Sequence, residues 1–283
     1  MTTNKGSPFT NRKGGMRVKG KDESSSHVKS VERALLLIDI LTTKQDGMSL
    51  TEIARTAQWP KSTVHGLLAT LRDYHMVDQS PENGHYRLGV RLFELGNLVA
   101  RSWDIRSVAL PAMRQMNKEL GEMIQLATED SGDVLYIEKL DSTHLLRIVS
   151  EIGARLPMHC SGLGKVMLAY KTPAEVKWII SQKGMRRLTP RTITDPALFD
   201  KELAKIRRQG YAMDDGEIMD SLRCVAAPIF DKEGKVKYAI SVSGIADSMQ
   251  GKYLNKVLEM LMHTAEIISY GMGYRPDEEK NTI

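Results

Sequence analysis

Two hydroxyl side chains, one lysine and one histidine cluster directly after Pro60. The segment reads Lys61-Ser62-Thr63, with His65 two residues further on. Proline suits the first turn of a helix, because its φ is already fixed near the helical value. Hydroxyl and backbone N–H groups at a helix N-terminus can bind phosphate, and side chains there can reach base edges in DNA. These residues therefore form a candidate DNA-binding group.

The same helix, which the pattern predicts over residues 61–74, has an apolar stripe on its opposite side. The stripe consists of Val64, Leu67, Leu68 and Leu71. Because successive helical residues are rotated by about 100°, the surface farthest from the stripe consists of Ser62, Gly66, Ala69 and Asp73, flanked by Thr63, His65 and Arg72. The small residues Gly66 and Ala69 would permit close approach. An ordinary amphipathic helix has a similar pattern, so the neighbouring segments must decide between the two interpretations.

Two helices are predicted before this one. Residues 31–41 carry apolar side chains at helical spacing, which indicates one buried stripe. Ser49 followed by Glu52 is a capping box, in which the hydroxyl accepts a backbone N–H and the carboxylate accepts one in return. A second helix is therefore expected to begin at Ser49 and to end before Pro60.

A short hairpin is predicted after the third helix. Asn83-Gly84 is a strong turn signal because both residue types tolerate positive φ, and the runs at 76–79 and 85–88 read as extended. Three helices followed by a hairpin predict a winged helix-turn-helix over residues 28–89. The candidate DNA-binding residues are Lys61, Ser62, Thr63, His65, Arg72 and Arg87, the last from the hairpin.

The net charge of this segment does not by itself indicate DNA binding. Residues 30–89 contain six Lys/Arg and seven Asp/Glu, whereas nucleic-acid-binding domains usually present a basic surface. The formal charge of +5 comes from residues 1–29, which hold seven basic and two acidic side chains. Residues 1–27 are predicted to be a disordered basic tail. A solubilising tail and an arm that contacts phosphates both fit this composition.

Length and composition fit a two-domain globular protein. The chain has 283 residues, of which 41% are hydrophobic and 27% are charged. Two cysteines are too few for a disulfide scaffold or a Cys-rich zinc site. No run reaches the roughly 20 apolar residues of a membrane span, and the N-terminus has no secretory signal pattern. A cytoplasmic protein with no membrane partner is expected.

The rest of the chain predicts a linker helix and a second, α+β domain. A helix over residues 90–103 is apolar on more than one face, so it is expected to be buried or to pair with a second chain as a dimerisation helix. Strands are predicted over 123–128, 134–140, 144–150, 223–230 and 236–243. Helices are predicted over 105–120, 161–170, 173–181, 196–209 and 251–271. This order favours an antiparallel sheet with flanking helices over residues 104–275, followed by a flexible C-terminus at 276–283.

Five segments in this order make the chain similar to the IclR family of bacterial transcription regulators. They are Val-Lys-Ser-Val-Glu-Arg-Ala-Leu (28–35), Pro-Lys-Ser-Thr-Val-His (60–65), Leu-Phe-Glu-Leu-Gly (92–96), Leu-Pro-Met-His-Cys-Ser-Gly-Leu-Gly-Lys (156–165) and Leu-Arg-Cys-Val-Ala-Ala-Pro-Ile-Phe (222–230). Parts of the second domain resemble the branch that includes pectin-degradation regulators.

The resemblance implies a regulator that controls promoters directly. It implies a winged helix-turn-helix that binds a double-stranded DNA operator, a linker helix and a GAF-like effector domain. It also implies homodimers that can pair into dimers of dimers. One departure concerns position 66, where many relatives carry arginine and this chain has Gly66. The operator preference therefore does not carry over.

The family also implies a small-molecule site in the second domain. Its matching positions are Ser161, Gly162, Asp214, Cys224, Ser241 and Ser243. A helix N-terminus near Ser161 would attract a carboxylate, and Ser241 and Ser243 would share one face of a strand. A sugar acid, an oxo-acid or an aromatic acid would fit this set. Each residue also has an ordinary structural interpretation, such as a turn at Asp214 or a core thiol at Cys224.

Two other functions remain open at this stage. Cys160 and Cys224 could form a thiol-based redox sensor if both lie near the site. An enzyme acting on a small acid would need a nucleophile with a base, and no such set is visible, so no catalytic residue is assigned. His159 beside Cys160 has no third ligand at suitable spacing. Neither a metal nor a cofactor is therefore expected.

Overall fold

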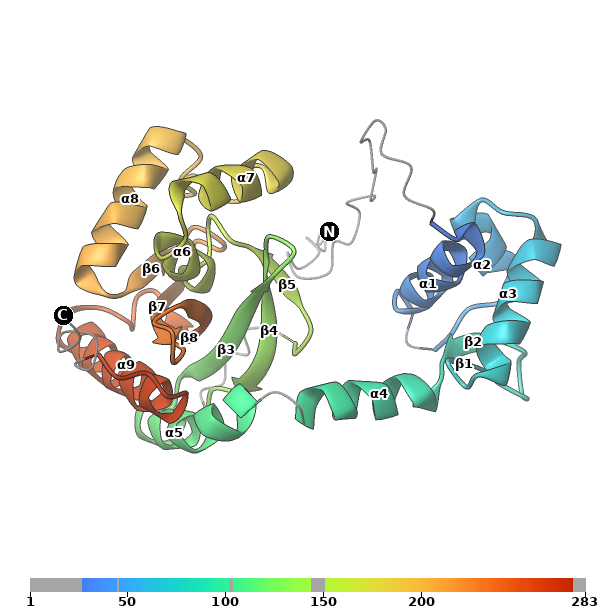
Figure 1. Ribbon diagram of the computed structural model, residues 1–283, viewed down its shortest axis with the longest axis horizontal. Coiled ribbons are helices and arrows are strands. Elements are labelled where there is room, and N and C mark those ends of the chain that lie inside the picture. The colour runs from blue at the N-terminus through green and yellow to red at the C-terminus, as the bar shows by residue number, and fades with distance from the viewer. Residues whose placement is uncertain (1–26, 45, 102–103, 144–150, 277–283) are drawn as a thin grey trace, which may run out of the picture. The chain divides into compact units, whose positions relative to one another are not determined.

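The computed structural model describes residues 27–44, 46–101, 104–143 and 151–276 (Figure 1). The described residues up to Arg101 form one compact unit, and those from Asp104 onward form another. Three predicted segments lie wholly or largely outside the described residues: the N-terminal tail, the strand over 144–150 and the C-terminal end. Within the described part, no helix is long and apolar enough to cross a membrane.

The first unit contains the three helices, the hairpin and the linker helix in the predicted order. Its elements are α1 (Lys29–Leu41), α2 (Leu50–Ala57), α3 (Lys61–Asp73), β1 (Val77–Gln79), β2 (Tyr86–Leu88) and α4 (Val90–Arg101). The strands β1 and β2 pair antiparallel, with Gln79 opposite Tyr86. The predicted winged helix-turn-helix is therefore confirmed.

The capping box at the start of α2 is present as the sequence predicts. The Ser49 Oγ accepts the Glu52 backbone N–H at 3.3 Å, and a Glu52 carboxylate oxygen accepts the Ser49 N–H at 2.9 Å. Lys44 Nζ donates to the other Glu52 oxygen at 2.7 Å. The Lys44 and Ser49 hydrogen bonds lower the pKa of Glu52 to about 2. The start of α2 is thus fixed by local side-chain contacts.

The core of the first unit anchors α3 by its predicted apolar stripe. Val64 and Leu68 of α3 are fully buried, whereas Leu67 and Leu71 pack at its edge. The fully or nearly fully buried partners are Leu37, Leu41, Met48, Ile53, Ala54, Val77 and Tyr86. Tyr86 also forms backbone hydrogen bonds with Met48 in both directions. Burial of one side of α3 therefore fixes which side faces outward.

The second unit is a six-stranded antiparallel sheet with helices packed against it. Its elements are α5 (Asp104–Leu120), β3 (Met123–Asp130), β4 (Asp133–Leu140), β5 (Arg155–Pro157), α6 (Gly162–Ala169), α7 (Pro173–Lys183), α8 (Pro196–Gln209), β6 (Ala212–Asp215), β7 (Leu222–Phe230), β8 (Val236–Ile245) and α9 (Gly251–Gly271). The strand order is β5-β4-β3-β8-β7-β6. This confirms the predicted α+β class. The short strands β5 and β6 were not predicted.

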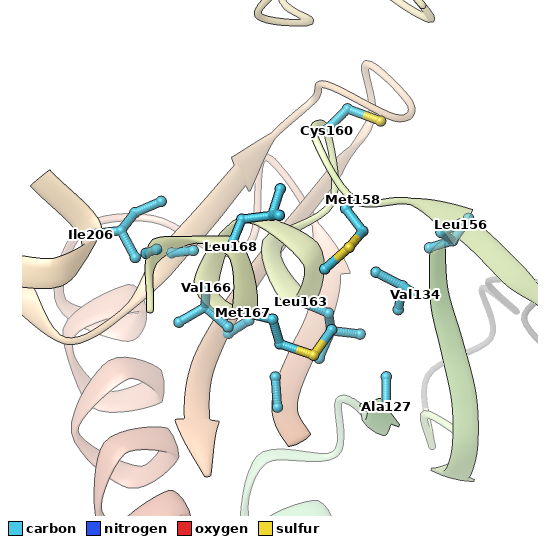
Figure 2. Packing of buried hydrophobic residues seen from close by; sticks show 14 of the residues in the cluster. Ala127, Val134, Leu156, Met158, Cys160, Leu163, Val166, Met167, Leu168 and Ile206 are labelled. Carbon is cyan, nitrogen blue, oxygen red and sulfur yellow. The ribbon is translucent and has the colours of Figure 1, made fainter. Parts of the chain in front are cut away.

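Helix α6 packs on one face of this sheet and forms its main apolar core (Figure 2). Leu163, Val166 and Met167 of α6 meet Ala127 of β3 and Val134 of β4 in this cluster. Helices α5 and α9 pack against each other, with α5 on β3 and β4 and α9 on β7 and β8 (Figure 1). Every residue of α6 is buried, so any polar group on α6 needs a partner inside the protein.

Lys165 is the charged residue of α6, and its side chain is 1% exposed. Its Nζ forms an ion pair with Glu217 and donates to the Met213 carbonyl at 2.6 Å. A carboxylate oxygen of Glu202 on α8 lies 3.8 Å away. A buried ammonium group requires such partners, because removal from water strongly disfavours the charge.

Two threonines fix the loop that carries Glu217. Thr189 Oγ1 donates to the Gly216 carbonyl, and Thr192 Oγ1 donates to the Glu217 carbonyl, each at 2.7 Å. The segment after β6 is therefore held from one side by Lys165 and from the other by the threonines.

We expect the Lys165→Ala substitution to lower the free energy of unfolding by about 3–5 kcal/mol, because it leaves Glu217 as an unpaired buried charge. Urea denaturation measures this. Lys171→Ala is the matched control, since Lys171 forms a partly exposed ion pair with Glu129 at 3.1 Å and should contribute about 1 kcal/mol or less. Equal losses in the two variants would contradict the structural role assigned to Lys165.

Candidate functional sites

The first candidate site is the outward side of α3. Lys61, Ser62 and His65 are exposed, and Thr63 is half-buried. Pro60 precedes the helix with a φ of −56°, and the Val64 N–H donates to the Pro60 carbonyl at 3.2 Å. The structure therefore places all four predicted side chains in the first two turns of α3, with Thr63 beside the buried stripe and the other three exposed.

The two candidate arginines lie around the hairpin. Arg72, near the end of α3, donates from Nη1 to the Gln79 side chain on β1 at 3.0 Å. Gln79 in turn donates to the Gly84 carbonyl at the hairpin turn, at 3.1 Å. Arg87 is exposed on β2. Arg72 thus links α3 to the hairpin, while most of its guanidinium donors stay available for phosphate.

Gly66 is exposed in the middle of α3, and a Cβ atom added there would meet no atom within 4 Å. Glycine in a helix interior costs about 1 kcal/mol relative to alanine. Packing among the residues that the structure describes therefore does not explain this glycine. A smooth surface on α3 would let a DNA backbone approach closely.

The second candidate site is a row of side chains across the sheet of the second unit. Asp214 of β6 pairs with Cys224 of β7, and Cys224 pairs with Ser243 of β8. Directly paired residues on neighbouring strands point to the same face of a sheet. Three predicted residues from distant parts of the chain thus lie side by side, and Ser241 lies two positions from Ser243 on the same face.

Asp214 is fully buried. Its Oδ1 accepts the Glu217 N–H at 2.6 Å and the Ile218 N–H at 3.4 Å. Its Oδ2 has no hydrogen-bond partner among the residues that the structure describes. Burial, which disfavours the charged carboxylate, raises the pKa of Asp214 to about 7. A buried oxygen without a partner is uncommon in folded proteins and marks this position as a candidate ligand contact.

Two residues that the sequence analysis missed complete this row. The Ser241 and Ser243 hydroxyls both donate to the Gln125 Oε1 on β3, at 3.2 and 2.7 Å. Tyr136 of β4 is buried, and its pKa is raised by burial and by the nearby Cys224 and Asp214. A sequence signal for Gln125 exists, since it is the polar residue within the apolar run 123–127. Tyr136 carries no comparable signal.

Ser161 and Gly162 hold the start of α6 against the sheet. The Ser161 Oγ accepts the Gly164 N–H and donates to the Pro157 carbonyl, each at 3.0 Å. A Cβ atom on Gly162 would lie 3.4 Å from the Ala226 Cβ. The helix start predicted here is confirmed. The Ser161 hydroxyl, however, already has two partners as the helix cap, so its local role is structural.

The two cysteines are buried free thiols. Burial raises the pKa of Cys160 to about 12 and also raises that of Cys224. Thiolates are the reactive form of cysteine, so both side chains are in the unreactive form near neutral pH. This environment disfavours the redox-sensor alternative.

His159 has a structural partner. Its Nε2 lies 3.0 Å from the Arg186 carbonyl oxygen, and burial lowers its pKa. Within the described ranges, no group of three His, Cys, Asp or Glu side chains is arranged to hold a metal ion.

Two family models match the chain. The IclR helix-turn-helix domain matches residues 30–81, and the C-terminal domain of bacterial IclR transcriptional regulators matches residues 97–270. The two matches cover both units and include most of the candidate residues.

Curated relatives match along nearly their whole length. The transcriptional regulator XynR of Escherichia coli is 34% identical over 247 residues, which cover 87% of this chain and 98% of XynR. The regulator KdgR of the same organism is 34% identical over 253 residues, which cover 89% of this chain and 96% of KdgR. The relatives therefore include KdgR, which belongs to the pectin-degradation branch that the sequence analysis named.

A solved structure shares the fold. An IclR homologue from Microbacterium hydrocarbonoxydans, complexed with 4-hydroxybenzoate, is 27% identical with a TM-score of 0.77, covering 86% of this chain and 98% of that one. The fold, the family models and the relatives agree, and the chain belongs to the IclR family of DNA-binding bacterial transcription regulators.

Proposed function

We propose that this regulator binds promoter DNA through the exposed side of α3 and the β1–β2 hairpin, and that a small organic acid bound in the second unit controls this binding. The observation that carries the DNA part is the outward position of Lys61, Ser62 and His65 on a helix whose other side is buried. Such a helix can enter a major groove of DNA while its buried side stays packed in the core of the first unit.

The row around Asp214 supports the effector part. It combines carboxyl, hydroxyl, amide and phenol groups on one face of the sheet, next to the start of α6. A helix N-terminus favours a carboxylate, and the hydroxyls can bind further oxygens of a ligand. The homologue complexed with 4-hydroxybenzoate supports an aromatic acid. A sugar acid or an oxo-acid satisfies the same polar groups.

Exposed apolar side chains support a homodimer. On α4, Val90, Phe93 and Leu98 are 58%, 72% and 58% exposed. On α1, Val31 and Leu35 are also exposed, one helical turn apart. A second copy that covers these faces would bring two copies of α3 to one operator. A ligand can alter DNA affinity only if it prefers one arrangement of the two copies.

We expect Lys61→Ala and His65→Ala to weaken binding to a DNA fragment from upstream of the protein's own gene. Loss of a phosphate contact by Lys61 should reduce the slope of log affinity against log salt by about 0.9. His65→Ala should reduce discrimination between this fragment and a scrambled duplex. Titration at several salt concentrations measures both effects.

Lys177→Ala, in the exposed part of α7, is the control for a lost positive charge elsewhere. This control should bind the fragment as the parent does. If Lys61→Ala and His65→Ala also bind as the parent does, α3 is not the DNA-binding helix.

We expect Phe93→Asp to dissociate the dimer, because a carboxylate would be buried in an apolar interface. Sedimentation of the parent and the variant measures this, with Glu94→Asp as the control on the same helix. A parent chain that is monomeric at all concentrations would contradict the proposed dimer.

We expect at least one of gluconate, pyruvate and 4-hydroxybenzoate to raise the thermal unfolding midpoint of the parent, because a ligand that binds only the folded state stabilises it. Asp214→Ala should abolish this shift, whereas Asp200→Ala on the exposed surface of α8 should keep it. If none of the three acids shifts the parent, the proposed ligand class is wrong.

A further inference from the structure

The buried carboxyl group of Asp214 has hydrogen-bond partners on one oxygen only among the residues that the structure describes. A buried carboxylate is stable only when a cation or several donors compensate its charge. The two backbone N–H groups of Glu217 and Ile218 both point at Oδ1. Oδ2 therefore needs a donor if Asp214 is charged, and an acceptor if Asp214 is protonated.

The nearest described cation is already engaged. Lys165 approaches from α6, but its ammonium group pairs with Glu217, donates to the Met213 carbonyl and lies near Glu202. Among the described residues, no ion pair involves Asp214. Lys165 favours the charged form of Asp214 only from a distance, and the negative charge of Glu217 opposes it.

Three further titratable groups among the described residues near Asp214 are neutral. They are Cys224 on β7, Tyr136 on β4 and Cys160 before α6. Burial raises the pKa of each of these groups, so they keep their protons near neutral pH. Among the residues that the structure describes, the surroundings of Asp214 therefore contain no free positive charge that would hold it as an anion.

We propose that Asp214 recognises the effector as a neutral carboxylic acid, donating the hydrogen on Oδ2 to a carbonyl or carboxylate oxygen of the ligand. This inference rests on the proposed effector site. The ligand group that faces Asp214 is then an acceptor, such as an oxo group or a carboxylate, rather than a hydroxyl or an amine. Hydrogen bonds between a neutral acid and a carboxylate are short and strong.

Protonation of Asp214 also removes a repulsion between two negative charges. An organic acid enters as an anion at neutral pH, and an ionised Asp214 facing it in a dry site would repel it. Binding should therefore retain or take up one proton. Linkage then requires the affinity to fall by about tenfold per pH unit once the pH exceeds the pKa of the free site.

The first test measures the affinity of pyruvate and 4-hydroxybenzoate by calorimetry from pH 6 to pH 9. The parent should lose affinity above about pH 7, where the pKa of Asp214 lies. It should also take up protons, which is seen as a dependence of the measured heat on the ionisation enthalpy of the buffer.

Asp214→Asn is the decisive variant. Its Oδ1 can still accept the N–H groups of Glu217 and Ile218, while its amide donates from the position of Oδ2 without titrating. It should bind within a few-fold of the parent at pH 6 and show no loss of affinity up to pH 9. Weak binding by Asp214→Asn at every pH, together with undiminished parent affinity at high pH, would show an anionic Asp214 and overturn the inference.

The second test needs no ligand. The pKa of an aspartic acid is about 3.9 in an unfolded chain, and the pKa of Asp214 in the folded protein is about 7. The folded state thus binds more protons between these values, so this group's contribution to stability falls as the pH rises. The midpoint of Asp214→Asn minus that of the parent should grow between pH 5 and pH 7 and level off at higher pH. A constant difference would contradict a neutral Asp214.

The two tests separate the two proposals. If an acid binds without any dependence on pH, the effector site stands and the neutral-acid inference is wrong. If no acid binds although the midpoint difference grows with pH, the proposed ligand class is wrong, and the recognition role of Asp214 is wrong with it.

Discussion

Burial of the Lys165 ammonium group is the constraint on which the second unit depends. An unpaired charge in that position would cost several kcal/mol, so the surrounding chain must supply acceptors. Glu217 and the Met213 carbonyl do so. Met213 lies in β6 and Glu217 follows two residues after its end, so their contacts with Lys165 fix the segment that carries Asp214. The ion pair therefore positions the candidate ligand contact without touching it.

The antiparallel register of the sheet then brings distant residues together. Asp214, Cys224 and Ser243 are separated along the chain, yet consecutive pairings place them in one row. The row lies on the face that α6 covers, so a ligand bound there would contact both the helix start and the sheet. In the first unit, burial of Val64 plays the corresponding part, because it fixes the outward side of α3.

Much of this arrangement could be predicted where a local rule decides the structure. The Ser49–Glu52 capping box and the stripe on α3 depend on residues close in sequence, and both are present. The strand β6 was missed because its sequence, Ala-Met-Asp-Asp, lacks β-branched and aromatic residues. β6 is held by its hydrogen bonds to β7 and by the contacts of Lys165 with Met213 and Glu217, and these partners are distant in sequence.

In the candidate sites too, features set by local sequence could be predicted and features set by distant partners could not. Glu217 and Gln125 were missed because their importance comes from partners that are far apart in sequence. Ser161 is predicted to contact a ligand, and in the structure its hydroxyl caps α6. A serine before Gly-Leu-Gly fits both roles, and only the contact with the Pro157 carbonyl shows that the hydroxyl is already hydrogen-bonded within the protein. Spacing along the chain can therefore place a residue in a site without giving the direction of its hydrogen bonds.

Hydrogen–deuterium exchange of the whole chain tests DNA binding by α3 most directly. Exchange is compared for the free protein, for the protein with a promoter fragment, and for the protein with a scrambled duplex of equal length. The account predicts slower exchange in α3 and in the β1–β2 hairpin with the promoter fragment, and a smaller effect with the scrambled duplex. Unchanged exchange in α3 while the promoter fragment is bound would contradict it, because DNA would then be held by another surface.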